Sequence, residues 1–450
     1  MSIFKAYDIR GIYAQDLTEN IVYSIGYFLP TLLNTKKILV GRDMRVSSPS
    51  LFTALCDGIN DAGATVYNAG LCTTPMVYYG TARFEFEASV MITASHNPGK
   101  YNGLKITRAK AMPVGFDTGL DLLEKMISND EVIIQPERGT IIPYSKQLQN
   151  SYFPFLNSFK PDFSNLNIGL DCSNGSSGYF VRQVLGEGPI YINDLPDGTF
   201  PNHEPNPLEP ENIIQLQQLV KEEKLDVGVI FDGDADRVMF TDENGKFISP
   251  DLLIAAMAHY FGPGNDRLVL HDIRTSRAVK EYLEKLGYHT HMWRVGRAYA
   301  AVKLREINGL YGGELAGHYY FSQFYFSDSG FIAAIILLDV FARFKEQHIT
   351  VSMLVEKIAG SWANTGEINY RITRKQEAMD AVRDFFLSQE QPVSNFDFDG
   401  YRVDFPKWWF NIRPSNTEPY LRFIAEADNQ NLLDQKLAQT QQIIQPFLDK

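Results

Sequence analysis

Three carboxylates separated by single small residues occur in the segment Asp232-Gly233-Asp234-Ala235-Asp236. The segment directly follows the apolar stretch Val227 to Phe231, which is typical of a buried strand. Because glycine and alanine add little bulk, the three carboxylates can turn toward one hard cation, and oxygen ligands of high charge favour Mg²⁺ over zinc. Arg237 follows at once and could bind a phosphate that shares the ion. The segment therefore predicts a metal site.

Other interpretations of this acidic segment stay open. It resembles the start of an EF-hand loop with Glu243 at the twelfth position, but Arg237 stands at the sixth position, where that loop needs glycine. A solvated acidic turn is a second alternative. A faint resemblance of Asp232-Gly233-Asp234 to the nucleophile motif of aspartate-dependent phosphatases is a third.

A serine lies at the end of another predicted strand. Ser95 follows the apolar stretch Ala88 to Ile92 and belongs to the loop Thr93 to Pro98. Serine is a weak nucleophile at neutral pH and needs a base or a metal ion, while backbone N–H groups of such a loop can hold a phosphoryl group. Lys105 could return to this serine. An ordinary Ser/Asn/Pro turn is the alternative, and alone the loop does not decide between them.

Two more polar loops contain residue types that could bind a sugar and a phosphate. In Tyr311 to His318, Glu314 can accept hydrogen bonds from neighbouring sugar hydroxyls, and His318 titrates near neutral pH. In Arg413 to Pro419, an arginine, two hydroxyls and an amide suit a phosphate. Taken singly, a structural hairpin and a surface turn explain them equally well. Together the four loops supply a nucleophile, a metal site, a sugar binder and a phosphate cradle, which moving a phosphoryl group on a sugar requires.

The elements that would position these loops follow a repeated pattern of strand, polar loop, helix, glycine and strand. The first strands are expected at Ile38–Asp43, Ile168–Ser173 and Leu268–Asp272, the helices at 49–62, 177–185 and 276–286, and the closing glycines at Gly63, Gly186 and Gly287. The pattern predicts three related α/β domains, although a generic βαβ pattern would look similar. From about residue 364 the pattern favours a smaller α+β domain with an antiparallel sheet.

Length and composition set further limits. At 450 residues the chain exceeds one ordinary core, and we expect domains at 1–147, 148–250, 251–362 and 363–450. The net charge is -12 and no run of Lys and Arg stands out, so we expect no nucleic-acid partner. The longest apolar run, Phe331 to Leu338, is too short for a membrane span, and no signal-peptide pattern opens the chain. We expect a cytoplasmic protein, a monomer or a weak oligomer.

Five segments, in order, resemble motifs of the α-D-phosphohexomutase family, in particular the bacterial phosphomannomutase/phosphoglucomutase type. They are Phe4 to Gly11 and the four loops described above. The resemblance covers the chain from end to end. It implies an α/β fold in which three related α/β domains with mixed sheets and a C-terminal α+β domain surround a central cleft.

The resemblance also implies a mechanism. Ser95 would carry a phosphoryl group, and Mg²⁺ would be held by Asp232, Asp234, Asp236 and an oxygen of the phosphoserine. A hexose 1-phosphate would become a 6-phosphate through a hexose 1,6-bisphosphate, which is also the activator. Arg10, Lys105 and His318 are candidates for acid/base and electrostatic help. The implied substrate-binding residues are Tyr7, His96, Arg237, Arg274, Arg297, Glu314, Arg413, Ser415, Asn416 and Thr417.

Three departures from the family pattern leave the preferred sugar open. Ala316 stands where relatives usually carry serine, Arg297 where many have histidine, and Arg274 where lysine is frequent. The substrate could be a mannose, glucose or glucosamine phosphate. A phosphoglucosamine mutase and a non-catalytic sugar-phosphate-binding relative are therefore the alternatives to a phosphomannomutase/phosphoglucomutase.

Overall fold

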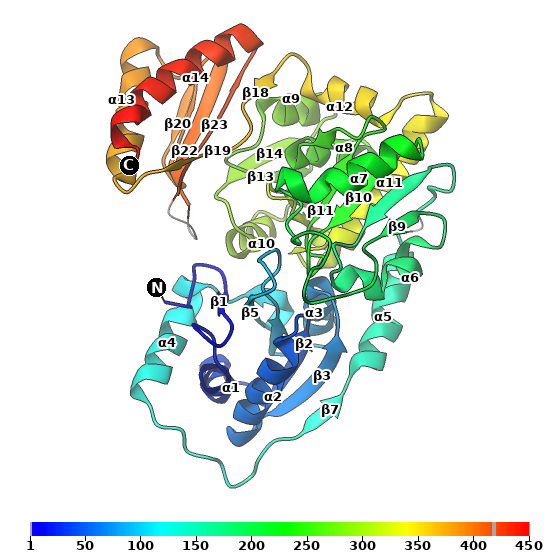
Figure 1. The fold of residues 1–450 in the computed structure, drawn as a ribbon, viewed down its shortest axis with the longest axis vertical. Helices are drawn as coiled ribbons and strands as arrows, with labels where there is room; N and C mark the ends of the chain where they lie inside the picture. The colour runs from blue at the N-terminus through cyan, green and yellow to red at the C-terminus, as the bar shows by residue number, and fades with distance from the viewer. Residues whose placement is uncertain (1, 160, 416–419, 450) are drawn as a thin grey trace.

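The computed structural model describes residues 2–159, 161–415 and 420–449. Its strands form four sheets that follow one another along the chain, and we call each sheet with its helices a unit. Figure 1 shows the first unit in blue at the bottom and the fourth in orange and red at the top left. The first three are mixed α/β units and the fourth is antiparallel, as the sequence predicted. The domain boundaries given above stay predictions.

The repeated pattern is confirmed in all three places. Each copy holds a pair of parallel strands: β2 (Lys37–Arg42) with β3 (Thr65–Leu71), β8 (Ile168–Asp171) with β9 (Ile190–Ile192), and β13 (Leu268–Asp272) with β14 (His289–Trp293). The connecting helices are α2 (Ser48–Asp61), α6 (Val181–Leu185) and α9 (Arg277–Lys285). Gly63, Gly186 and Gly287 have φ of 78°, 80° and 80°, a region that favours glycine after a helix.

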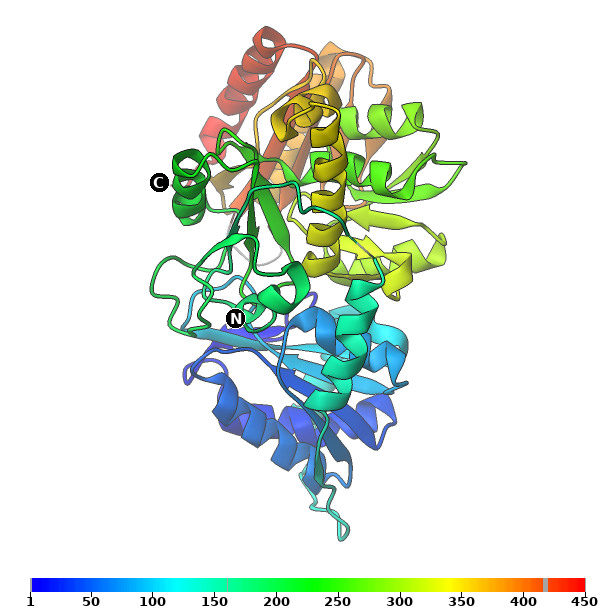
Figure 2. The same ribbon diagram turned by 90° about the vertical axis from the view of Figure 1, so that its right-hand side faces the viewer.

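The first unit places its sheet in the order β1-β5-β4-β2-β3-β7. Its other strands are β1 (Ile9–Ile12), β4 (Ala88–Ile92), β5 (Tyr101–Arg108), β6 (Met112–Pro113) and β7 (Ile141–Pro143). Its other helices are α1 (Glu19–Leu33), α3 (Thr74–Arg83), α4 (Leu120–Asn129) and α5 (Ser145–Asn157). The extended segment between α4 and β7 runs below this unit in both Figure 1 and Figure 2.

The second and third units continue the chain upward in Figure 1. The second adds α7 (Ile214–Glu222), β10 (Val227–Phe231), β11 (Val238–Thr241) and β12 (Phe247–Ile248). The third adds α8 (Pro250–Phe261), α10 (Arg297–Glu306), β15 (Tyr311–Gly313), β16 (Tyr319–Phe321), β17 (Ser327–Asp328), α11 (Gly330–Glu346) and α12 (Val351–Ala359). The side chains of α11 are buried from Phe331 to Ala342, so the longest apolar run of the sequence is core. In the described ranges no helix is both long and apolar enough to cross a membrane.

The fourth unit is antiparallel throughout its described strand pairs. Its strands are β18 (Ala363–Asn364), β19 (Ile368–Arg371), β20 (Ser394–Phe396), β21 (Tyr401–Asp404), β22 (Trp408–Pro414) and β23 (Tyr420–Ala427), with helices α13 (Lys375–Gln389) and α14 (Gln430–Ile444). The sequence pattern predicts a last helix from Asn431 to Leu448, but the helix ends at Ile444 and a 3-10 turn, Gln445–Phe447, follows it. Pro446 explains the difference, because proline lacks the N–H that an α-helical hydrogen bond needs.

Two kinds of contact hold the units together. One apolar cluster runs from Leu39 to Ile358 and joins the first three units, whereas the fourth unit has its own cluster between Ile372 and Ile444. The third and fourth units meet mainly through polar groups, together with the stacked rings of Trp293 and Phe398, whose centroids are 5.7 Å apart. Arg402 donates from Nη1 to the carbonyls of Ile273 and Thr275 at 2.7 and 2.8 Å. The fourth unit is thus attached largely by hydrogen bonds and ion pairs.

Candidate active site

The loops after β4 and β10 meet, although 137 residues separate their key side chains. Ser95 is 1% exposed, and its Oγ donates a hydrogen bond to Asp232 Oδ2 at 2.9 Å. Gly233 allows this approach, since a Cβ there would lie 2.5 Å from the Ser95 carbonyl oxygen. The serine and the acidic segment, which the sequence treated separately, belong to one buried site.

The three carboxylates form a compact acidic cluster. Asp232, Asp234 and Asp236 are fully buried, with ligand oxygens within 4.8 Å of one another. Within the described part of the chain, Oδ1 of Asp234 and Oδ1 of Asp236 accept no hydrogen bond. Burial, and then the charges of Asp236 and Asp234, raise the pKa of Asp232 well above its usual range. Unpartnered oxygens and concentrated negative charge fit a divalent cation held by oxygen ligands.

Lys105 lies against this cluster. Its Nζ is 2.7 Å from Asp234 Oδ2 and 2.5 Å from Asp236 Oδ2, and it comes from β5, where it pairs with Met91 of β4. Burial alone would lower the pKa of Lys105, but the charges of the aspartates outweigh it and raise the pKa. The lysine therefore stays charged and pairs with two of the aspartates, whereas the sequence had suggested that it could return to Ser95.

Other basic groups surround Ser95. Arg10 of β1 donates from Nη1 to Asn97 Oδ1 at 2.6 Å and pairs with Asp8. The Nδ1 of His96 lies 3.5 Å from Ser95 Oγ. Burial, and then the charge of Arg237, hold the pKa of His96 well below its usual range, so its ring is neutral. Arg10 thus brings a positive charge to the serine loop, whereas the neutral His96 brings none.

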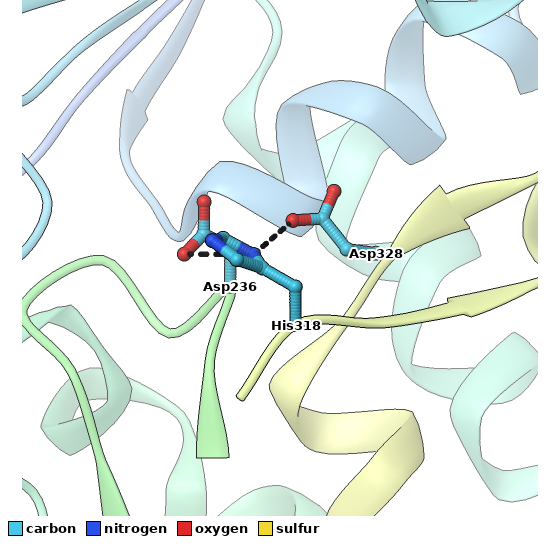
Figure 3. A group of neighbouring side chains, drawn as sticks. All are labelled: Asp236, His318 and Asp328. Atoms are coloured by element: carbon cyan, nitrogen blue, oxygen red, sulfur yellow. Dashed lines mark hydrogen bonds and ion pairs between the residues drawn. The ribbon is translucent and has the colours of Figure 1, made fainter. Parts of the chain in front are cut away.

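His318 is held at both ring nitrogens, as Figure 3 shows in part. Its Nδ1 lies 2.7 Å from Asp328 Oδ2 and 3.8 Å from Asp236 Oδ1. On the other side Arg237 Nε donates to Nε2 at 3.0 Å. Because Nε2 accepts from an arginine, Nδ1 carries the ring proton and donates it to Asp328.

Asp328 is a site residue that sequence reasoning missed. Besides His318, it accepts a hydrogen bond from Arg297 Nε at 3.1 Å, and the Arg297 guanidinium stacks on the Tyr78 ring at 3.9 Å. Arg297 therefore points to Asp328. Asp236, His318 and Asp328 lie close enough together to suggest a second cation site. However, Arg297 donates to Asp328 and Arg237 donates to His318, so these side chains form a hydrogen-bonded network that already carries two guanidinium charges. A cation is therefore not favoured there.

The predicted sugar loop is the β15–β16 hairpin. Glu314 is 2% exposed, accepting from Tyr320 Oη at 2.6 Å and from the Gly296 N–H at 3.3 Å. Burial raises the pKa of its carboxyl group. The next residue, Leu315, donates its N–H to Asp272 Oδ2 at 2.8 Å. Tyr7 donates from its hydroxyl to the carbonyl of Val295, beside this hairpin, at 3.1 Å.

The predicted phosphate loop begins where β22 ends. Arg413 lies directly opposite Arg422 of β23, and Arg274 approaches from the loop after β13. Glu367 lies among these three arginines. Ser415 follows β22, while the predicted Asn416 and Thr417 lie outside the described residues. The sequence had suggested Arg274 and Arg413 but neither Glu367 nor Arg422.

Arg45 is a further residue that sequence reasoning missed, and it supports the loop that carries Ser95. It is 1% exposed and donates four hydrogen bonds to backbone carbonyls. The acceptors are the carbonyls of Ser95 (2.9 Å), Asn97 (2.6 Å), Pro98 (2.8 Å) and Tyr101 (3.0 Å). Its Nε pairs with Asp43 at 3.1 Å. Arg45 therefore fixes the loop that presents Ser95.

Comparison with known proteins agrees with this arrangement. Four family models match in order, described as phosphoglucomutase/phosphomannomutase alpha/beta/alpha domains I, II and III on residues 1–132, 143–245 and 249–360, and C-terminal domain on residues 367–441. A phosphomannomutase of Methanocaldococcus jannaschii is 31% identical over 454 residues, which cover 99% of this chain and 98% of the relative. A phosphomannomutase of Escherichia coli is 32% identical over 446 residues, covering 95% of each.

The solved structures give the same result. A phosphoglucomutase/phosphomannomutase family protein from Burkholderia thailandensis superposes with a TM-score of 0.84 at 25% identity, covering 99% of this chain and 97% of that one. The fold and the buried serine–carboxylate site define a multidomain phosphoryl-transfer enzyme. The chain belongs to the phosphoglucomutase/phosphomannomutase family, and it is an intramolecular phosphotransferase of carbohydrate metabolism.

Proposed function

We propose that this enzyme interconverts the 1-phosphates and 6-phosphates of mannose, glucose or both, with Ser95 as the carrier of the phosphoryl group. The observation that carries the proposal is the 2.9 Å contact between Ser95 Oγ and Asp232 inside a buried site lined by Arg10, Lys105 and Arg237. The names of the relatives support the sugar phosphates as substrates. The family-wide match supports the mutase reaction.

The proposed reaction has two transfers. In the first, the bond between phosphorus and Ser95 Oγ breaks and a bond from phosphorus to the hexose O6 forms, while the O6 proton leaves to a base. The resulting 1,6-bisphosphate turns around. In the second, Ser95 Oγ takes the phosphoryl group from O1, and O1 regains a proton. A hexose 1,6-bisphosphate added from outside would restore a phosphoryl group to a Ser95 that has lost it, and it would therefore act as an activator.

The residues around Ser95 have distinct proposed roles. Asp232, Asp234 and Asp236, with an oxygen of the phosphoserine, would hold Mg²⁺, which would offset negative charge on the transferred group. Arg10, Lys105 and Arg237 concentrate positive charge where that group lies. His318 is the proposed acid/base group: Asp328 fixes its ring, and Nε2, which now accepts from Arg237, would take the sugar proton once that arginine binds the transferred phosphate.

The sugar and the distant phosphate would be bound by the third and fourth units. Glu314, on the β15–β16 hairpin, is the proposed reader of sugar hydroxyls, and Tyr7 and His96 are further proposed contacts. Arg274, Arg413 and the loop from Ser415 through Asn416 and Thr417 would hold the phosphate that does not react. In this proposal Arg297 acts indirectly, since its guanidinium is engaged with Asp328 and Tyr78.

Phosphorus NMR tests the proposal. Mannose 1-phosphate and glucose 1-phosphate are each incubated with the protein, Mg²⁺ and a trace of glucose 1,6-bisphosphate. We expect the 6-phosphates to appear without free phosphate, and we expect the Ser95→Ala variant to form neither. Ser388→Ala, a change in the exposed last turn of α13, is the matched control and should keep full activity.

Each other outcome identifies an alternative. Free phosphate formed by Ser95→Ala would point to an aspartate-dependent phosphatase. Turnover of glucosamine 1-phosphate, with mannose and glucose phosphates unchanged, would make the enzyme a phosphoglucosamine mutase. Strict selectivity for one of mannose and glucose would narrow the proposal to that sugar.

A further inference from the structure

Three arginines converge where the third and fourth units meet. Arg413 and Arg422 are directly opposed in the antiparallel pair β22–β23, so their side chains share one face of the sheet. Arg274 joins them from the loop after β13. Like charges directly opposite each other on a sheet are destabilising, so this cluster requires a counter-anion.

Glu367 supplies that anion. Its Oε2 lies 3.2 Å from Arg274 Nη1 and 3.6 Å from Arg413 Nη2, and its Oε1 lies 2.9 Å from Arg422 Nη1. Burial would raise the pKa of Glu367, but the charges of Arg274, Arg413 and Arg422 outweigh burial and hold it below its usual value. The residue lies between β18 and β19, so a single carboxylate links a loop of the third unit to the sheet of the fourth.

Arg413 keeps one nitrogen without a partner among the described residues. Arg413 is 3% exposed, and its Nε makes no hydrogen bond to any described residue. Burial, and then the charge of Arg274, lower the pKa of Arg413, while the charges of Glu367 and Asp399 raise it in part. Among the nearby carboxylates, Asp272 already pairs with Arg274 at 2.7 Å and accepts the N–H of Leu315 at 2.8 Å. Arg413 is therefore the arginine that an incoming anion would satisfy.

We propose that Glu367 is an internal competitor for the phosphate of the substrate. It occupies the guanidinium groups of Arg274, Arg413 and Arg422 when no phosphate is bound, and it yields them when a hexose phosphate arrives. The inference rests on the proposed function, in which this cluster holds the phosphate that does not react. Competition weakens the binding of phosphate. A weaker hold favours release of a bisphosphate that must turn around between the two transfers.

Calorimetric titration tests this competition without turnover. The Ser95→Ala variant and the Ser95→Ala/Glu367→Gln variant are titrated with glucose 6-phosphate and, separately, with inorganic phosphate. Removing the competing charge should lower Kd for both ligands by about two- to fivefold, the range expected for a partly exposed ion pair. Glutamine keeps the size of the side chain, so a change in Kd reports the charge.

Two further variants locate the effect. Glu377→Gln removes the same charge from the exposed surface of α13, where Glu377 pairs with Arg374, and it should leave Kd unchanged. In an Arg413→Gln background, Glu367→Gln should no longer tighten binding, because the arginine that gains the phosphate is missing.

The outcomes separate this inference from the proposed function. An unchanged or higher Kd in Glu367→Gln would contradict the proposed competition between Glu367 and phosphate. Glu367 would then only orient the arginines. Tightening that persists in the Arg413→Gln background would also contradict the proposed competition. If Glu367→Gln tightens the binding of inorganic phosphate as expected but no hexose phosphate binds, the proposed competition is supported and the proposed function is wrong.

Discussion

The repeated pattern of strand, loop and helix contains the same aspartate turn in the first and third units, after β2 and at the end of β13. The two units use this turn differently. In the first unit Asp43 accepts the N–H of Arg45 at 3.0 Å and pairs with its guanidinium at 3.1 Å. In the third unit Asp272 accepts the N–H of Arg274 at 2.7 Å and pairs with its guanidinium at 2.7 Å. Both are aspartate turns in which the side chain bonds the backbone two residues on.

The difference lies in what the remaining N–H groups of each arginine meet. Arg45 donates to four backbone carbonyls, which are fixed parts of the chain. Arg274 reaches Glu367, a side chain that another anion can replace. One turn therefore produces a permanent support in the first unit and an exchangeable anion contact in the third. What faces the turn, rather than the turn itself, decides its use.

Breaking the permanent support should have the largest effect. Arg45→Met removes four hydrogen bonds to carbonyls and leaves the buried Asp43 without its cation, so we expect a loss of about 3–5 kcal/mol in the free energy of unfolding. Urea denaturation measures it. Arg182→Met, which removes a half-exposed arginine paired with Glu187 and Asp194, is the control and should change the stability by less than about 1 kcal/mol. A similar small loss for Arg45→Met would show that the carbonyl contacts contribute little.

The two aspartates provide a matched pair. Asp43→Asn leaves Arg45 buried with only neutral partners, whereas Asp272→Asn leaves Arg274 with Glu367 as a counter-charge. Asparagine can still accept the backbone N–H in both turns. We therefore expect Asp43→Asn to reduce the free energy of unfolding by about 2 kcal/mol more than Asp272→Asn does. Equal losses in urea denaturation would contradict the distinction between the two turns.

Removing the exchangeable arginine should affect binding more than stability. Arg274→Met leaves Asp272 with the Leu315 N–H and Glu367 with the other two arginines. We expect KM for the hexose phosphate to rise about tenfold, which corresponds to about 1.4 kcal/mol, with less than about 1 kcal/mol lost in stability. Steady-state kinetics and urea denaturation of the same preparation measure both. A large loss of stability with unchanged KM would make Arg274 a support like Arg45.

The second unit, whose turn lacks an arginine, should show the smallest effect. Asp171 accepts the N–H of Ser173 at 2.7 Å and contacts His203 Nε2 at 3.0 Å. Burial lowers the pKa of His203, but the hydrogen bond and charge of Asp171 outweigh it and raise the pKa above its usual 6.5. The contact between protonated His203 and Asp171 therefore stabilises the folded state. This stabilisation is complete below the pKa that His203 has in the unfolded state, and it is lost as the pH rises through the pKa that His203 has in the folded state.

Thermal unfolding at a series of pH values tests this contact. Going from pH 6 to pH 8, the wild-type protein should lose about 1–2 °C more in Tm than His203→Gln, which has no such proton to lose. A pH dependence that is the same in both proteins would show that the Asp171–His203 contact does not stabilise the folded chain.

Much of this fold could be predicted from the sequence. The strands Ala88–Ile92 and Val227–Phe231 were expected at their observed bounds, because each is a run of five buried, mostly apolar residues that ends at a polar loop. The sequence predicted one strand from about residue 364, where the structure has the two strands β18 and β19, and it missed the edge strand β20, since such short segments carry no periodicity. The ends of helices were also hard to predict, as the 3-10 turn at Pro446 after α14 shows.

The site was predictable where one loop contained the chemistry and not where distant loops combined it. Ser95 and the three aspartates were recognised from their own neighbours in sequence. Asp328 and Glu367 carry no local signal and acquire a role only through His318 and the arginines that the fold brings to them. Arg45 did have a signal, because the spacing Asp-x-Arg recurs at Asp272-Ile273-Arg274 in the corresponding position of the third unit.

The largely polar attachment of the fourth unit has a consequence for how the protein responds to its solvent. Mobile ions screen charge pairs near the surface over about 10 Å at 0.1 M salt, but they leave buried apolar contacts almost unaffected. Arg277–Asp404, whose side chains are 17% and 10% exposed, is partly buried and is screened in part, whereas the apolar cluster joining the first three units is not open to screening. Raising the ionic strength should therefore weaken the contact between the third and fourth units more than the contacts among the first three. The mobility of the fourth unit should then depend on the salt concentration around the protein.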